Sequence, residues 1–467
     1  MVYEFAKPED TIVAISTPIG TSAIGVVRVS GGKAVEIVSK YFRSRRGKSL
    51  DSKKWGMLSG QFVDSDGSVI DEVIVLVMRA PNSYTGEDVV EIHAHGNILI
   101  LRTIVEKLLV GGARIAEPGE FTRRAFLNGK MDLTQAEAVL DQITAKTRRA
   151  LALSWSIYEG KLTRKISEYT EKLKTVLAWV EAEIDFVDEE IPADLWERTK
   201  ENLRLLIEDM KKLLSTADEG KILREGAVVV IAGKPNVGKS SLFNALLRKN
   251  RAIVSPYPGT TRDQIEEFVN IEEVPIRLVD TAGLRETFEP VEQEGIKRAW
   301  DALNTANVVL FVFDASDIGE ADIQMFEKCR SNIEDEYLYK KVIFVINKID
   351  VKPDPILPAY FSEFPCKKVY TSAIKEVGIK DLEKVLLETL LRPESSYNDL
   401  VLFHEHQKHS LSKAVECVKR CIEQENLGQE LVAFELREAL TALGEITGET
   451  TSEEILDIIF SSFCIGK

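Results

Sequence analysis

A glycine-rich loop between a buried strand and an amphipathic helix constrains this chain more than any other feature of its sequence. The loop is Gly233–Ser240 (GKPNVGKS), and it follows the β-branched run Ala227–Ala232. This is the GxxxxGKS/T pattern in the strand–loop–helix context that indicates phosphate binding. Loop N–H groups and the helix N-terminus hold anionic oxygens. The sequence therefore predicts a nucleotide-binding α/β domain in which Lys239 reaches the β- and γ-phosphates and Ser240 ligates Mg²⁺.

Further segments follow in the order typical of a GTPase. They are Pro258–Asp263 (PGTTRD), Asp280–Gly283 (DTAG), Asn347–Asp350 (NKID) and Thr371–Ala373 (TSA). The first offers a threonine to the metal, and the second offers an aspartate to Mg²⁺ and a glycine N–H to the γ-phosphate. A carboxylate in the third can accept hydrogen bonds from N1–H and the exocyclic amine of guanine, and it leaves adenine unpaired. Together these segments resemble a Ras-like GTPase G domain.

One position departs from the Ras pattern. Leu284 follows the DTAG segment, so no glutamine stands where Ras-like enzymes orient the attacking water, although Arg285 is nearby. Hydrolysis should be slow unless another group supplies that role. Asn236 resembles the loop asparagine of potassium-dependent GTPases, and its alternative explanation is loop geometry alone.

The flanking segments indicate a chain of several domains. The length of 467 residues predicts about three domains, and the net charge of −15 excludes a global basic surface for nucleic acid. Strand-like pieces and one helix precede residue 120, and helical periodicity surrounds the G domain on both sides. We expect an α+β N-terminal domain (1–120), a helical domain in two parts (121–216 and 393–467) and an inserted G domain (217–392).

Two helical faces are predicted within these flanks. A stripe of apolar residues at helical spacing comprises Ile166, Tyr169, Leu173, Val176, Leu177, Val180 and Ile184. A second stripe comprises Leu431, Phe434, Leu440 and Leu443 and is expected to end at Gly444. The chain has no signal-like start and no apolar run long enough to span a bilayer, so a cytoplasmic protein without a membrane partner is expected.

Three motifs outside the G domain carry a specific resemblance. They are Asn82–Asp88 (NSYTGED), Pro118–Lys130 (PGEFTRRAFLNGK) and Phe463–Lys467 (FCIGK). With the G-domain segments, they make the whole chain resemble the MnmE (TrmE) family of tRNA-modification GTPases. The resemblance implies a homodimer that acts with the flavoprotein MnmG, the FAD residing on that partner. Together they would attach a carboxymethylaminomethyl-type group to C5 of the wobble uridine of certain tRNAs.

The resemblance also implies a one-carbon donor and roles for individual residues. The N-terminal domain would bind 5-formyl- or 5,10-methylene-tetrahydrofolate through Arg28, Glu91, Lys130 and Lys467. Cys464 would be an essential group whose chemical role stays open, a nucleophilic thiolate being one option, and the composition-based alternative is a small buried hydrophobe. Glu292 would replace the missing glutamine, so that the catalytic set is Glu292, Cys464 and Lys239.

Nucleotide and metal ligands are assigned in the same way. Mg²⁺ would be held by Ser240 and Thr261. K⁺ would be held by Asn236, Ser255, Tyr257 and Thr260, in a loop that Pro256 and Pro258 stiffen. The implied GTP-binding residues are Asn236, Val237, Gly238, Lys239, Ser240, Ser241, Ser255, Thr260, Thr261, Asp280, Thr281, Ala282, Gly283, Asn347, Lys348, Asp350, Ser372, Ala373 and Ile374.

Other features leave alternatives open. Glu91, His93 and His95 alternate on one strand face, where a pair of them could bind a metal, but the sequence shows no third ligand of matching spacing. His404, His406 and His409 are expected on one helix. Basic runs at 43–48, 123–124 and 146–149 are candidate RNA contacts or solubilising charge. The rival functions are a ribosome-assembly GTPase without modification chemistry and a folate-dependent aminomethyltransferase that the G domain only regulates.

Overall fold

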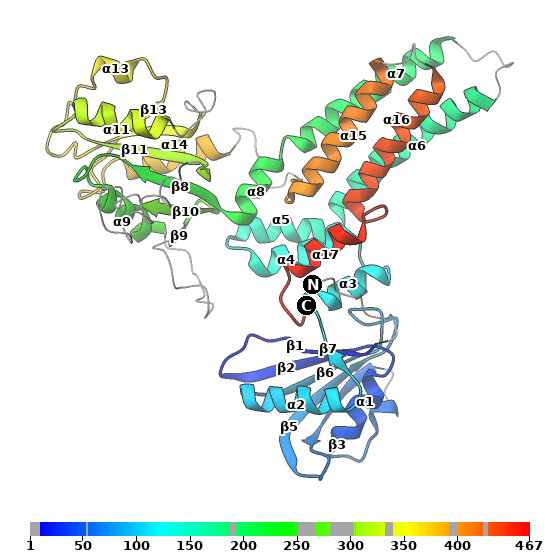
Figure 1. Cartoon of the computed structure of the whole chain (residues 1–467). Coiled ribbons are helices and arrows are strands. Elements are labelled where there is room, and N and C mark those ends of the chain that lie inside the picture. The colour runs from blue at the N-terminus through cyan, green and yellow to red at the C-terminus, as the bar shows by residue number, and fades with distance from the viewer. Residues whose placement is uncertain are drawn as a thin grey trace. The chain divides into compact units, whose positions relative to one another are not determined.

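The structure is a computed structural model that describes residues 10–52, 55–185, 193–250, 267–280, 303, 305–331, 340–391, 400–423 and 428–467 (Figure 1). It contains two compact units. The first unit comprises Met1–Leu140, Tyr158–Leu173 and Leu440–Lys467, and the second comprises Asp141–Ile157 and Lys174–Ala439. Among the helices in these ranges, none has the length and apolarity needed to cross a bilayer. The predicted domain boundaries stay predictions.

A seven-stranded sheet forms the N-terminal part of the first unit, in the order β3-β4-β5-β6-β2-β1-β7. Neighbouring strands are antiparallel except for the parallel pair of β1 and β7. The strands are β1 (Ile12–Ile15), β2 (Ser22–Ser30), β3 (Phe42–Ser44), β4 (Trp55–Val63), β5 (Val69–Met78), β6 (Val89–Gly96) and β7 (Arg114–Ile115). The strand-like pieces expected before residue 120 are thereby confirmed, and β3, β4 and β7 were not predicted.

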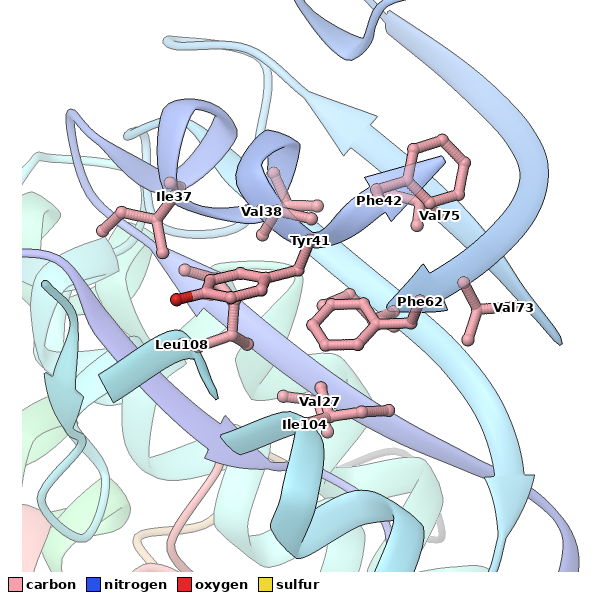
Figure 2. Close-up of a cluster of buried hydrophobic side chains, with 14 of the residues drawn as sticks. Val27, Ile37, Val38, Tyr41, Phe42, Phe62, Val73, Val75, Ile104 and Leu108 are labelled. Atoms are coloured by element: carbon pink, nitrogen blue, oxygen red, sulfur yellow. The ribbon is translucent and has the colours of Figure 1, made fainter. Parts of the chain in front are cut away.

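One face of this sheet packs against α1 (Ala34–Tyr41) and α2 (Ile98–Val110), with the short 3-10 helix Leu50–Ser52 beside them. Burial alternates along β5 because only one of its faces meets the core. Figure 2 shows Tyr41 and Phe62 stacked in this core, with ring centroids 5.9 Å apart. Each such fully buried side chain contributes about 1.5–3 kcal/mol, which fixes the sheet that carries the residues of the first site.

The C-terminal end of the chain packs in the same unit. The further helices of the first unit are α3 (Glu120–Leu127), α17 (Glu453–Ser461) and parts of α4 (Leu133–Thr144), α6 (Lys161–Asp185) and α16 (Gln429–Thr447). Ala125 of α3 shares one apolar cluster with Phe460 and Phe463. Gly119 permits this close approach, because a Cβ there would lie 2.6 Å from the Phe460 carbonyl oxygen. Burial of these aromatic rings therefore brings the C-terminus to the start of α3.

The G-domain part of the second unit is a six-stranded sheet in the order β13-β12-β11-β8-β10-β9. All neighbours are parallel except β9, which pairs antiparallel with β10. The strands are β8 (Ala227–Ala232), β9 (Glu267–Ile271), β10 (Val274–Asp280), β11 (Val308–Asp314), β12 (Val342–Asn347) and β13 (Lys367–Tyr370), and the helices are α9 (Lys239–Asn250), α11 (Glu320–Arg330), α13 (Ala359–Ser362) and α14 (Ile379–Leu390). This is the predicted α/β P-loop fold.

The remaining helices of the second unit form its helical part. They are α5 (Arg148–Tyr158), α7 (Ala193–Leu214), α8 (Ala217–Glu225) and α15 (Glu405–Glu423), with the rest of α6 and α16. The apolar face predicted on α6 is confirmed. Its buried members are Ile166, Tyr169, Leu173, Val176 and Val180.

The stripe predicted on α16 is confirmed only in part. Leu443 is buried, whereas Leu431 and Phe434 are 41% and 55% exposed, and the other buried apolar positions include Val432, Leu436, Ala439 and Ile446. The helix also continues through Gly444 to Thr447. That glycine allows close packing rather than termination, because a Cβ there would lie 2.7 Å from the Thr450 hydroxyl oxygen.

Candidate functional site

The carboxyl ends of the parallel strands place the phosphate loop and the NKID and TSA segments at one edge of the second unit's sheet. The loop Gly233–Gly238 joins β8 to α9, and two of its glycines have positive φ (140° and 97°). A Cβ at Gly233 would lie 2.4 Å from the Val312 carbonyl oxygen, so only glycine permits this approach to β11. Lys239, at the start of α9, is buried, and its Nζ donates to the carbonyl oxygens of Gly233 (2.9 Å) and Lys234 (3.0 Å).

Asn347, at the end of β12, fastens this loop to the segment after β13. Its Nδ2 donates to the Val237 carbonyl oxygen (3.0 Å), and its Oδ1 accepts from the Ala373 N–H (3.0 Å). Lys348 donates from Nζ to the carbonyl oxygen of Asn236 (2.7 Å), whose φ is 67°. The NKID and TSA segments therefore hold the shape of the phosphate loop as well as their own.

A pocket opens between these segments. It is lined by Gly238, Ser241, Asn347, Lys348, Asp350, Val351, Ala373 and Ile374. The Ser372 hydroxyl donates to Asp350 Oδ1 (2.6 Å), and this hydrogen bond holds the pKa of Asp350 below its usual range. The carboxylate is therefore ionised at neutral pH and can accept the two N–H groups of a guanine. Val351 was not predicted, and no sequence signal distinguishes it.

Not every predicted nucleotide or metal ligand can be placed. Ser240 is exposed in the first turn of α9, and the backbone of Asp280 ends β10 in register with Ile231 of β8. Other predicted positions lie outside the described residues: Ser255, Pro256, Tyr257, Pro258, Thr260, Thr261, Thr281, Ala282, Gly283, Leu284, Arg285 and Glu292.

A second group of predicted residues meets in the first unit. Arg28 on β2 and Glu91 on β6 are cross-strand partners, and their Nε and Oε1 atoms are 2.9 Å apart. The Arg28 guanidinium lies 5.5 Å from the ring centroid of Tyr84 and 5.6 Å from that of Phe121. Tyr84 belongs to the NSYTGED motif, and Phe121 belongs to the PGEFTRRAFLNGK motif. Their contact with Arg28 was missed from the sequence, although the motifs were the available signal.

The last five residues, Phe463–Lys467, which we name the C-terminal tail, complete this group. Ile465 forms an antiparallel bridge with Pro118, and the Phe121 N–H donates to the Lys467 carbonyl oxygen (3.2 Å). Arg28 Nη1 donates to the Gly466 carbonyl oxygen (3.3 Å). These contacts bring Lys467 and Cys464 to Arg28 and Glu91, which lie more than 370 residues earlier in the ~470-residue sequence.

The tail presents a thiol and an amine. Cys464 is exposed, whereas Cys329, Cys366, Cys417 and Cys421 are buried. The composition-based alternative, a small buried hydrophobe at Cys464, is therefore wrong, because the residue is exposed. Burial, together with the nearby Arg28 guanidinium, lowers the pKa of Lys467, and Cys464 lies close enough to act on the same amine.

Lys130 is not among the residues that contact Arg28. Its Nζ donates to the Pro81 carbonyl oxygen (3.0 Å), and its side chain passes the backbone of Gly86. His93 Nε2 lies 3.4 Å from Glu91 Oε2, while His95 turns to Asp71 on β5 (2.8 Å). The alternating Glu91, His93 and His95 therefore do not converge on one point.

The two N-terminal motifs are joined by a buried ionic network. Arg124 of α3 contacts Glu87 Oε1 (3.1 Å) and Glu120 Oε1 (3.0 Å), and Glu120 also contacts Arg114 Nη1 through Oε2 (2.9 Å). Burial opposes ionisation of Glu120, yet its hydrogen bonds with Arg114 and the Glu117 N–H keep its pKa below the usual range. The network fixes the start of α3, from which Phe121 reaches the tail.

Three sequence expectations about charged residues need correction. Arg124 is 9% exposed at its side chain, so it is not an RNA contact. Arg149 is also buried, in an ion pair with Glu219, whereas Lys146 is exposed and its Nζ lies over the Phe268 ring. His404 precedes α15 rather than lying on it, and its ring is close to that of His406 (centroids 5.9 Å apart). Ion pairs with Glu87, Glu120 and Glu219 accompany the burial of Arg124 and Arg149.

Comparison with known proteins decides what these two groups of residues belong to. A family model described as "MnmE helical domain" matches residues 133–464, and one described as "GTP-binding protein TrmE N-terminus" matches residues 11–130. The tRNA modification GTPase MnmE of Carboxydothermus hydrogenoformans is 45% identical over 98% of this chain and 100% of its own. The chain belongs to the MnmE family of tRNA modification GTPases.

A second curated relative carries the same name. The tRNA modification GTPase MnmE of Aquifex aeolicus is 43% identical, covering 98% of this chain and 100% of its own. Among solved structures, Aquifex aeolicus Era bound to GDP.AlF4- aligns at 30% identity over 41% of this chain and 66% of its own, with a TM-score of 0.29. As an MnmE family member, the chain is an enzyme that binds GTP and hydrolyses it in tRNA modification.

Proposed function

We propose that this GTPase acts as a homodimer with a flavoprotein partner of the MnmG type, whose FAD is not held by this chain. Together they add a carboxymethylaminomethyl-type group to C5 of the wobble uridine of certain tRNAs. The one-carbon unit comes from 5-formyl- or 5,10-methylene-tetrahydrofolate bound to the first unit. The single observation that carries this proposal is the docked C-terminal tail, which puts an accessible thiol and a partly buried amine beside Arg28 and Glu91.

The residues around the tail fit a reduced folate chemically. Glu91 can accept hydrogen bonds from the N–H groups of a pterin, and the rings of Tyr84 and Phe121 offer apolar faces. Burial raises the pKa of Tyr84, so its phenol stays protonated at neutral pH. Arg28 and Lys467 bring positive charge that suits folate carboxylates, and the exposed Lys130 can extend it. The folate would supply the one-carbon unit.

The chain's own groups divide the remaining work. Cys464 supplies an accessible nucleophile, and Lys467 supplies an amine beside it that can hold or release a proton. In the G domain, Asp350 selects guanine, Lys239 and the loop N–H groups hold phosphates, and Ser240 with Thr261 would ligate Mg²⁺. Asn236, Ser255, Tyr257 and Thr260 would hold K⁺, and Glu292 would orient water. Hydrolysis then drives a conformational cycle rather than the uridine chemistry.

Folate binding tests the proposal directly. Purified full-length chain is titrated calorimetrically with 5-formyl-tetrahydrofolate, alongside the variants Glu91→Gln and Arg28→Met. We expect each variant to weaken binding at least tenfold, because each removes a charged group from the site. Arg148→Met in the second unit is the control and should bind as the wild type does. Equal affinity in all four proteins would contradict the assignment of the folate site.

The cation requirement is tested separately. GTP hydrolysis is measured in potassium and in sodium chloride at equal ionic strength, with wild type and Asn236→Ala. We expect faster hydrolysis in potassium and the loss of that preference in the variant. Equal rates in both salts would remove the proposed K⁺ role while leaving the folate site standing.

A further inference from the structure

In the sequence, the hairpin of β9 and β10 connects the segment predicted to offer a threonine to Mg²⁺ with the segment predicted to contact Mg²⁺ and the γ-phosphate. β9 begins at Glu267, shortly after the PGTTRD segment, and β10 ends at Asp280, the first residue of DTAG. Because β9 and β10 are paired along their length, a displacement at the open end of the hairpin is transmitted to its turn. That turn is the two-residue segment Glu272-Glu273.

This turn is built from unfavourable residues. Glu272 and Glu273 have φ values of 45° and 65°, in the left-handed region that two-residue hairpins require and that Asn-Gly satisfies best. A Cβ makes that conformation costly, so two glutamates in this turn suggest that at least one side chain makes a stabilising contact. In the structure, Glu273 makes such a contact.

Glu273 caps a helix of the helical part. Its Oε2 accepts a hydrogen bond from the Arg148 N–H (2.7 Å), the first N–H of α5. That N–H has no partner within the helix, and a carboxylate is favoured by the positive end of the helix dipole. The Thr147 hydroxyl caps the Ala150 N–H in the same turn (3.2 Å).

Two further contacts connect the start of α5 with β9 and α8. Lys146 Nζ lies 3.6 Å from the ring centroid of Phe268 on β9 and donates to the Glu225 carbonyl oxygen at the end of α8 (3.1 Å). Arg149 pairs with Glu219 of α8 at 2.6 Å, with both side chains buried. The basic run 146–149 therefore contacts both the hairpin and α8, the helix that precedes β8.

We propose that the contacts of Glu273 with Arg148 and of Phe268 with Lys146, which we name the α5 latch, transmit the nucleotide state of the G domain to the helical part. In the structure the latch is closed. Displacement of the hairpin on GTP binding withdraws Glu273 from α5, and the first turn of that helix is released. The latch rests on the GTPase activity alone and not on the one-carbon chemistry.

Hydrogen exchange of full-length protein tests the latch. Peptides covering the first turn of α5 are followed by mass spectrometry, with GDP and with a non-hydrolysable GTP analogue. Wild-type peptides should exchange about fivefold faster with the analogue, the factor that corresponds to losing a helix cap of about 1 kcal/mol. In Glu273→Ala, exchange should be fast with both nucleotides and the difference should vanish.

Glu272→Ala is the matched control. It changes the neighbouring turn residue of similar positive φ and should keep the wild-type difference. Glu273→Gln keeps the side-chain size and should lose at least half of the difference, which covers the case in which Glu273→Ala does not fold. All variants should bind GDP as the wild type does. A nucleotide-dependent difference that persists at full size in Glu273→Ala or Glu273→Gln, or one absent from the wild type, would overturn the proposal.

Discussion

Replacing Gly466 with alanine should detach the C-terminal tail from the first unit. Gly466 has a φ of 97°, a conformation that residues with a Cβ rarely adopt. A Cβ at this position would also lie 2.5 Å from the Ile15 carbonyl oxygen and 2.9 Å from Ser16 Cα. Both obstacles are backbone atoms of or beside β1, which the core holds in place, so the tail has to move instead.

The magnitude follows from two terms. Placing alanine in this region of φ costs about 1–3 kcal/mol, and forcing an extra carbon into a packed contact costs about 1–3 kcal/mol more. Together the two costs weaken docking of the tail by at least about 2 kcal/mol, which shifts the equilibrium roughly thirtyfold from the docked toward the free tail. The contacts at risk are those of Gly466 with Arg28 and of Lys467 with Phe121.

Release of Lys467 by carboxypeptidase B, followed by intact-protein mass spectrometry, reports this equilibrium, because the enzyme needs a free C-terminus. Gly466→Ala should lose Lys467 at least about thirtyfold faster than the wild type. Gly112→Ala is the matched control, since φ there is 111° and a Cβ would meet nothing within 4 Å. Unstructured peptides ending in IGK and IAK correct for the preference of the enzyme.

Equal release rates for wild type and Gly466→Ala, after that correction, would refute the docked tail. So would a wild-type rate equal to that of the free peptide. In either case Cys464 and Lys467 would not be held beside Arg28, and the basis for the first-unit site would be lost.

Three further predictions concern single charged groups. Asp350→Asn should weaken GTP binding about hundredfold or more and favour xanthosine triphosphate, whose C2 carbonyl accepts a hydrogen bond from the new amide. An unchanged nucleotide preference in a fluorescence competition assay would contradict the assignment of guanine to this pocket. Arg124→Met should lower the free energy of unfolding of the first unit by about 1–3 kcal/mol in urea, because it removes the cation that pairs with Glu87 while Glu120 keeps Arg114; a loss below about 0.5 kcal/mol would show that the network is not needed. Because the pKa of Lys467 is lowered from 10.5 in the docked tail, the docked state binds fewer protons than the free tail, so docking should strengthen as pH rises through the interval below 10.5; a protein-to-peptide ratio of release rates that stays constant from neutral to alkaline pH would contradict this.

The G domain was predictable because its chemistry is encoded locally. Each phosphate or guanine segment directly follows a β-branched strand, and parallel strands bring such ends to one edge. The face of α6 was predictable for a similar reason, since it covers five turns of consistent spacing. These signals needed no knowledge of distant contacts.

Long-range packing decided what the sequence could not show. On α16, the small residues Ala433 and Ala439 are buried while the larger Phe434 is exposed, so side-chain size misled the choice of face. The sequence alone suggests surface charge at Arg124 and Arg149, because their distant partners Glu87 and Glu219 come beside them only in the folded chain. The tail site depends on contacts across almost the whole chain, and only the family resemblance pointed to it.

Nucleoside mass spectrometry of tRNA tests the central claim most directly. Cells lacking this gene are compared with cells that carry the wild-type chain, Cys464→Ser or Glu292→Ala. The C5-modified uridine should disappear without the gene and return only with the wild type, while purified Cys464→Ser should still hydrolyse GTP and Glu292→Ala should not. An unchanged nucleoside profile in the deleted cells, or full rescue by Cys464→Ser, would contradict the proposal that the docked tail performs uridine modification.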